Sequence, residues 1–239
     1  MSAQYRNARL PLVLLPGLLC DARLWNHQAS HLSDMADISV PDMTGADSMV
    51  ALAGQVLAHM PDRFALAGLS MGGYLAFEIL RQAPGRVSRL CLLDTTARPD
   101  TAEQRARREG LIRLAEGGKF ASIPGLLLPN LIHPDRLRDE SLAGTITAMA
   151  LDIGVEAFCR QQRAIMDRPD SRPGLPSIQV PTLCIVGRED AITPPDRAEE
   201  MAAGIPGARV AVVERCGHLS TLEQPEAVTA LMREWLAQP

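Results

Sequence analysis

Short runs of apolar residues alternate along the chain with longer segments in which apolar residues recur at helical spacing. Several of the runs are apolar at every position, as in strands that are covered on both faces of a parallel sheet. The regular alternation of strand and helix predicts an open α/β sheet. The predicted strands are Leu10–Leu15, Ile38–Val40, Phe64–Leu69, Ser88–Asp94, Thr182–Gly187 and Ala208–Glu214, and the predicted helices are Ser48–Met60, Met71–Ala83, Pro195–Ala203 and Pro225–Leu236.

The alternation of strands and helices stops between about Ala97 and Pro176. A charged run of helical character, "TAEQRARREGLIRLAE", begins at Thr101, and an apolar patch, "IPGLLLPNLI", begins at Ile123. Because the segment is too apolar in its middle for a linker, we predict a helical cap over residues 98–176, inserted into an α/β core of residues 1–97 and 177–239. We interpret most leucines of the patch as the cap's own core and not as pocket lining.

The N-terminal apolar run allows two interpretations. Arg6 and Arg9 precede "LPLVLLPGLLC", an arrangement similar to a short signal peptide, but Pro16 and Gly17 interrupt the run. We favour a buried strand followed by a loop. We expect no other run to approach the length of a membrane span, so we predict no membrane partner.

Composition narrows the classes of protein further. Hydrophobic residues make up 46% of the 239 residues but aromatic residues only 3%, which predicts a core of aliphatic side chains and methionine. The net charge of −4, without a basic block, argues against nucleic acid as a partner. The five cysteines are scattered without a CxxC pair, which indicates reduced thiols and a cytoplasmic location.

One serine lies where a predicted strand passes directly into a predicted helix. The stretch "FALAGLSMGGYLAFEIL" places Ser70 between Gly68 and Gly72, in the pattern G-x-S-x-G. A serine that projects from such a sharp turn adopts a strained backbone conformation, and glycine on either side avoids clashes of Cβ atoms. The start of the following helix also offers unpaired backbone N–H groups beside the hydroxyl. The alternative is a glycine-rich turn in which Ser70 only caps the helix.

A histidine and two aspartates follow other predicted strands. His218 lies in a loop after the last strand, free to reach across the carboxyl ends of the sheet, and Asp190 lies just past the preceding strand. The chain order Ser70, Asp190, His218 is that of a hydrolase triad. Asp94 is the second candidate acid, although it runs into the cap beside threonines that favour a local turn. The other histidines have weaker contexts, and we interpret them as surface or packing residues: His27, His31, His59 and His133.

The first strand ends in Pro16-Gly17-Leu18, and from this loop onward the chain resembles the α/β-hydrolase superfamily, specifically its small, capped, cofactor-free esterase-like members. Two further loops, "PDMTG" and "LLDTTARPD", are similar to loops of the superfamily, so that the resemblance covers nearly the whole chain. It implies a mostly parallel sheet with helices on both faces, and an oxyanion hole whose donors are the N–H groups of Leu18 and Met71. Pro16 stands where the superfamily usually has a histidine, which leaves Leu18 and Leu19 open as the first donor.

The triad predicts a serine hydrolase that cleaves a small carboxylic ester, thioester or lactone through an acyl-enzyme. Carbon–carbon bond hydrolysis, perhydrolysis and lyase chemistry on the same triad remain alternatives, as does a non-catalytic binding protein with this fold. Within the superfamily that the chain resembles, haloalkane dehalogenases and epoxide hydrolases use an aspartate as the nucleophile, so Ser70 argues against both of these chemistries. No metal site and no cofactor are predicted, because the sequence has no HExxH, GxGxxG or P-loop motif.

The predicted partner is a small-molecule substrate, and the oligomeric state stays open. The few aromatic residues and the leucine- and methionine-rich cap and oxyanion loop favour an uncharged substrate of modest size. Four arginines near the predicted cap entrance are the groups that would bind an anion instead: Arg98, Arg105, Arg107 and Arg108.

Overall fold

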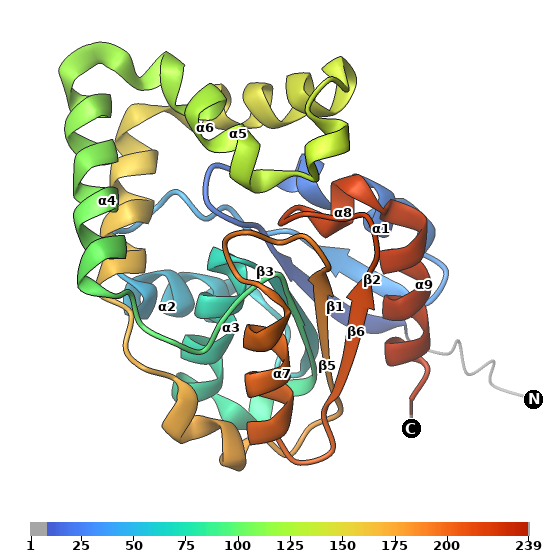
Figure 1. The fold of residues 1–239 in the computed structure, drawn as a ribbon. Helices are drawn as coiled ribbons and strands as arrows, with labels where there is room; N and C mark the ends of the chain where they lie inside the picture. Colours follow the sequence, from blue (N-terminus) through green and yellow to red (C-terminus); the bar gives the residue numbers. More distant parts are fainter. Residues whose placement is uncertain (1–8, 239) are drawn as a thin grey trace, which may run out of the picture.

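A computed structural model describes residues 9–238 and shows a layered α/β fold (Figure 1). Within this range, six parallel strands form one sheet in the order β2-β1-β3-β4-β5-β6. Parallel neighbours need crossover connections, and the helices in these connections cover the sheet. The strands are β1 (Leu10–Leu15), β2 (Ala36–Ser39), β3 (Phe64–Leu69), β4 (Val87–Leu93), β5 (Thr182–Gly187) and β6 (Arg209–Val213).

Helices pack on both faces of the sheet because successive side chains of a strand point to opposite sides. In β1, Val13 and Leu15 belong to one buried cluster, whereas Leu12 and Leu14 belong to the other. The first cluster includes residues of α2 (Met49–His59), α3 (Met71–Gln82) and α7 (Pro195–Gly204). The second includes residues of α9 (Pro225–Leu236), which packs against α1 (Asn26–His31) and follows the short α8 (Ser220–Glu223).

The fold class predicted from the sequence is confirmed, and most predicted elements agree with the structure to within one residue at each end. The edge strand β2 begins earlier than its apolar residues indicate, because Ala36 pairs with Leu10. The N-terminal apolar run is β1, which lies between β2 and β3 in the sheet. Arg6, part of the signal-like arrangement, lies outside the described residues.

Three helices lie together over one end of the sheet: α4 (Ala102–Leu114), α5 (Ile123–Leu131) and α6 (Glu140–Met166) (Figure 1). Thr101 and Gln104 form a capping box that starts α4, and the carboxylate of Asp139 accepts the Leu142 N–H at the start of α6. These helices share a small apolar core that includes Phe120, Ile123 and Phe158. We call this helical layer the cap.

The helix α6 departs from one expectation drawn from the sequence. It spans 27 residues and is, by length and composition alone, apolar enough to cross a membrane, although no such run was expected here. Its course is interrupted at Gly154, where φ is 79° and ψ is 172°, values that lie outside any helix. Apolar residues of α6 on both sides of Gly154, such as Ile146 and Phe158, are buried inside the protein.

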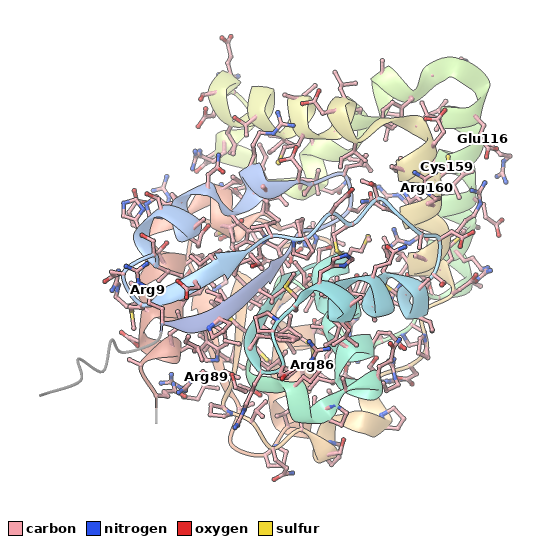
Figure 2. All side chains as sticks on the ribbon, turned by 180° about the vertical axis from the view of Figure 1, so that it is seen from behind. Arg9, Arg86, Arg89, Glu116, Cys159 and Arg160 are labelled. Atoms are coloured by element: carbon pink, nitrogen blue, oxygen red, sulfur yellow. The ribbon has the colours of Figure 1, made fainter. Side chains whose placement is uncertain are left out.

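The C-terminal half of α6 also fastens the cap to the α/β core. The Arg160 guanidinium donates to the Thr44 carbonyl at 2.8 Å, and the Gln161 amide donates to the Met43 carbonyl at 3.2 Å. Arg160, Cys159 and Glu116 lie at the same corner of the cap (Figure 2). The cap is therefore held by polar contacts with the loop after β2 as well as by its apolar core.

Candidate active site

Ser70 lies in a sharp turn between β3 and α3. Its φ of 54° and ψ of −112° are strained for a residue with a side chain. The turn brings backbones very close: a Cβ on Gly68 would lie 2.3 Å from the Gly72 carbonyl oxygen, and one on Gly72 would lie 2.1 Å from that of Leu15. The Ser70 N–H donates to the Leu93 carbonyl at 2.9 Å. Close backbone packing thus holds the serine at the carboxyl end of the central strands.

A continuous chain of hydrogen bonds links Ser70, His218 and Asp190. The Ser70 Oγ lies 2.8 Å from the His218 Nε2, and the His218 Nδ1 lies 2.8 Å from the Asp190 Oδ2. Backbone N–H groups of Ile192 and Thr193 donate to the Asp190 Oδ1 at 2.8 and 2.9 Å. The Thr193 hydroxyl donates to Oδ2 at 2.7 Å. The carboxylate is therefore fixed by its own loop with one oxygen directed at the imidazole.

The charges of His218 and Asp190 stabilise one another inside the protein. Burial disfavours protonation of His218, but the negative charge and hydrogen bond of Asp190 outweigh it and raise the histidine's pKa above 6.5. Burial likewise disfavours ionisation of Asp190, but the charge and hydrogen bond of His218 and the bonds from Thr193 lower the aspartate's pKa below 3.8. At neutral pH Asp190 is an anion that faces the imidazole.

Two backbone N–H groups beside Ser70 are unoccupied within the described chain. Those of Leu18 and Met71 donate no hydrogen bond to any group in residues 9–238. The Leu19 N–H, by contrast, donates to the Gln161 Oε1 at 3.1 Å. Of the two residues that the sequence left open as first donor, Leu18 is therefore the one whose N–H is available to a ligand.

Asp94, the other candidate acid, lies in the same buried region but forms different contacts. It is fully buried with a φ of 44°, and it accepts the Gly187 N–H at 2.9 Å and the Ser220 N–H at 3.2 Å. Burial and the charge of Asp190 raise the pKa of Asp94 to about 7. Asp94 therefore ties the end of β5 to the start of α8, while Asp190 holds the imidazole itself.

A cavity of about 210 Å³ lies between Ser70 and the cap. Leu127 and Leu131 of α5 line it, whereas Leu126 is exposed to solvent and Ile123 lies in the core of the cap. The apolar patch predicted to be mostly cap core is thus divided between cap core, cavity wall and surface. The cavity gives the Ser70 hydroxyl a largely apolar surrounding.

The sequence profile of the alpha/beta hydrolase family matches residues 12–231, nearly the whole chain. The chain belongs to the alpha/beta hydrolase family. One curated relative, the pimeloyl-(acyl-carrier protein) methyl ester esterase of Neisseria meningitidis serogroup C, is 32% identical over 195 residues, which cover 78% of this chain and 74% of the relative. The protein of the same name from Aromatoleum aromaticum is 26% identical over 95% of this chain and 98% of its own length.

Solved structures of other hydrolases are similar to this alpha/beta hydrolase over nearly its full length. A thermophilic esterase from Thermogutta terrifontis, with malate bound, is 33% identical with a TM-score of 0.89, and the match covers 96% of this chain and 90% of the esterase. An enol-lactonase from Burkholderia xenovorans is 26% identical with a TM-score of 0.88, over 98% of this chain and 94% of the lactonase.

Several residues that support the site in this alpha/beta hydrolase escaped the sequence analysis. Glu223 is buried and accepts the Gly217 N–H at 2.9 Å and the His133 N–H at 2.6 Å, which ties the His218 loop to the cap. Thr193 donates to the Asp190 carboxylate and Gln161 accepts the Leu19 N–H, as described above. A threonine three residues after an aspartate that follows a strand is a weak signal for a turn that binds the carboxylate. For Gln161 the sequence offers none, because both of its partners are distant in the chain, and for Glu223 it does not show the contact with His133, 90 residues away.

Proposed function

We propose that this chain is a serine hydrolase that cleaves small carboxylic esters through a Ser70, His218, Asp190 triad and an acyl-enzyme intermediate. The observation that carries the proposal is the unbroken hydrogen-bond chain from the Asp190 carboxylate through His218 to the Ser70 hydroxyl, with 2.8 Å at each step. The names of relatives that are 26–33% identical, two methyl ester esterases and a thermophilic esterase, support the same reaction class.

In the first step, the Ser70 Oγ attacks the ester carbonyl carbon as its proton passes to the His218 Nε2. A serine hydroxyl is a weak nucleophile, so it needs this base within hydrogen-bonding distance. The imidazole can accept the proton at Nε2 only if its own proton lies on Nδ1. The Asp190 Oδ2 enforces that tautomer and then stabilises the imidazolium that forms.

The oxygen of the attacked carbonyl becomes negatively charged and needs donors that are already in place. The N–H groups of Leu18 and Met71 serve this role, since both are unoccupied and flank the serine. Each such donor stabilises the transition state by about 3–4 kcal/mol in comparable enzymes. The start of α3 adds a positive partial charge at the same position.

Collapse of the tetrahedral intermediate expels the alcohol, which takes the proton from His218. A water molecule then attacks the acyl-enzyme, with His218 again as the base, and the acid product leaves. A lactone is a cyclic ester and passes through the same steps, and the likeness to an enol-lactonase favours lactones as the second substrate class.

Covalent labelling by a fluorophosphonate tests the proposal, since the reagent reacts with activated serines. We expect stoichiometric labelling of the wild type, and mass spectrometry of the labelled peptide should place the adduct on Ser70. Ser70→Ala should lose both labelling and ester hydrolysis, while Ser141→Ala, at an exposed serine of the cap, should retain both. An adduct on another residue, or hydrolysis that survives Ser70→Ala, would refute the assignment.

A further inference from the structure

One wall of the cavity is polar, and it belongs to the cap. Arg107 and Arg108 of α4 and Gln162 of α6 line the cavity together with the core residues around Ser70. The helices α4 and α6 pack side by side (Figure 1), so these three residues share one part of the wall. None of them takes part in the reaction steps described above.

Gln162 carries a hydrogen-bond donor without a partner. Its side chain is fully buried, and its Nε2 has no acceptor among residues 9–238. Exchanging the amide oxygen and nitrogen does not remove the problem, because Arg108 Nη1 donates to the Gln162 Oε1 at 2.9 Å and guanidinium groups only donate. A buried N–H without an acceptor is unfavourable, so an acceptor supplied by a ligand in the cavity would stabilise this wall.

Positive charge is in excess around Arg108, through two residues that do not themselves line the cavity, Asp100 and Arg168. The buried carboxylate of Asp100 lies between two guanidinium groups, those of Arg108 and Arg168, each at 2.7 Å. One negative charge thus faces two positive ones. Arg107 adds a further positive charge, and its guanidinium forms no ion pair or hydrogen bond with any residue from 9 to 238.

The other arginines that the sequence placed near the cap entrance are engaged elsewhere. Arg98 pairs with Glu200 at 2.8 Å, and Arg105 pairs with Asp167 at 3.0 Å. Neither lines the cavity. Of the four arginines, Arg107 is therefore the one that both lines the cavity and has its guanidinium available.

We infer that Gln162, Arg107 and Arg108 form a carboxylate site, and that the preferred substrate is an ester carrying a free carboxylate at the end remote from the scissile bond. The inference rests on the proposed function, since it concerns the substrate of the same serine. A carboxylate consists only of acceptors, which suits the unpartnered Gln162 Nε2 and the two guanidinium groups, whereas the other amides of the lining, those of Gln104 and Asn130, are neutral. Its charge matches the excess positive charge, which a neutral amide or ketone would leave unpaired.

The size of the cavity limits the substrate. A volume of about 210 Å³ is small for a ligand pocket, so we expect the acid and ester groups to be separated by a short chain. The half-esters of short dicarboxylic acids have both the free carboxylate and the short chain. The sequence favours an uncharged substrate, from its few aromatic residues and its leucine- and methionine-rich cap, whereas the pairing of the arginines favours an anionic one.

The test compares kcat/KM for monomethyl and dimethyl esters of glutarate, adipate, pimelate and suberate. A second series, acetyl esters of hydroxy acids and of their methyl esters, places the carboxylate on the alcohol side of the scissile bond. We expect the wild type to prefer the anionic member of one series by about tenfold or more. The series that shows the preference identifies the side of the ester bond that faces the cap.

Two variants and one control test whether these residues cause the preference for the anionic ester. Arg107→Gln, at an exposed position that tolerates substitution, should lower kcat/KM for the anionic ester about tenfold, mainly through KM, and change the neutral ester less than about twofold. Gln162→Leu should act in the same direction. The control Arg105→Gln, one turn from the site and paired with Asp167, should change neither.

Equal rates for anionic and neutral esters, or equal losses on both in Arg107→Gln, would overturn the carboxylate site. The proposed function would still stand in that case if a fluorophosphonate labels Ser70 and neutral esters are hydrolysed. A protein that hydrolyses no ester and is not labelled would instead refute the proposed function.

Discussion

Replacing Asp190 by asparagine tests the triad at its most sensitive point. Two backbone N–H groups, those of Ile192 and Thr193, donate to the Asp190 Oδ1. In Asp190→Asn these donors keep the amide oxygen at that position, so the amide nitrogen takes the place of Oδ2. It then lies 2.8 Å from the His218 Nδ1 and can only donate to it.

The consequence is the wrong tautomer of His218. With Nδ1 acting as an acceptor, the imidazole proton lies on Nε2, which faces Ser70 and can no longer take its proton. The same change in a serine protease lowers kcat about 10⁴-fold, which corresponds to ~5.4 kcal/mol at ~1.36 kcal/mol per tenfold. We expect a loss of that order here, because the fold around the carboxylate remains in place.

The assay is kcat/KM on an activated neutral ester, with circular dichroism as the test of folding. Asp94→Asn is the matched control, since Asp94 accepts the Gly187 and Ser220 N–H groups and has no hydrogen bond to His218. It should lower stability by about 1–3 kcal/mol, through one donor left unpaired, and leave turnover within about tenfold. A folded Asp190→Asn protein with more than about a tenth of wild-type activity would refute the reasoning, as would a collapse of turnover confined to Asp94→Asn.

Two further predictions concern pH and the turn at the nucleophile. The rate of hydrolysis should fall as pH decreases, because protonated His218 cannot accept the Ser70 proton. The midpoint of this fall should lie above pH 6.5, since Asp190 raises the pKa of the histidine despite burial. A rate that stays flat to pH 5 on folded protein would point to another base. Gly72→Ala should destabilise the protein by about 3 kcal/mol or more in urea unfolding, because its Cβ would lie 2.1 Å from the Leu15 carbonyl oxygen. The control Gly54→Ala, inside α2 with nothing within 4 Å of the new Cβ, should stabilise by about 0.5–1 kcal/mol, and equal effects of the two alanines would contradict the clash.

The parts of the molecule that the sequence predicts are those encoded by short stretches of chain. Apolar runs of strand length and the glycines around Ser70 act on their immediate neighbours, so periodicity and spacing are sufficient to find them. The role of Gln161 is different, because its partners are Leu19 and Met43, more than a hundred residues away. The pairing of arginines in the cap is equally non-local, and it decides which charge remains for a ligand.

The division of labour between Asp94 and Asp190 illustrates the same limit. Both aspartates follow parallel strands that are neighbours in the sheet, and the sequence alone left both as candidate acids. The choice depends on which carboxylate the surrounding N–H groups hold toward the imidazole. That is a property of the folded loops and not of the residues beside either aspartate.

The contacts of Gln161 make the conformation of the loop after β1 depend on the position of the cap. One side chain of α6 accepts the Leu19 N–H and donates to the Met43 carbonyl, so a cap that moves away breaks both bonds at once. Leu19 has a φ of 59°, a strained conformation that the contact with Gln161 helps to hold. A displacement of the cap would therefore reach the loop beside Ser70 as well as the cavity wall, so that access to the serine and the position of the Leu18 N–H depend on the same side chain.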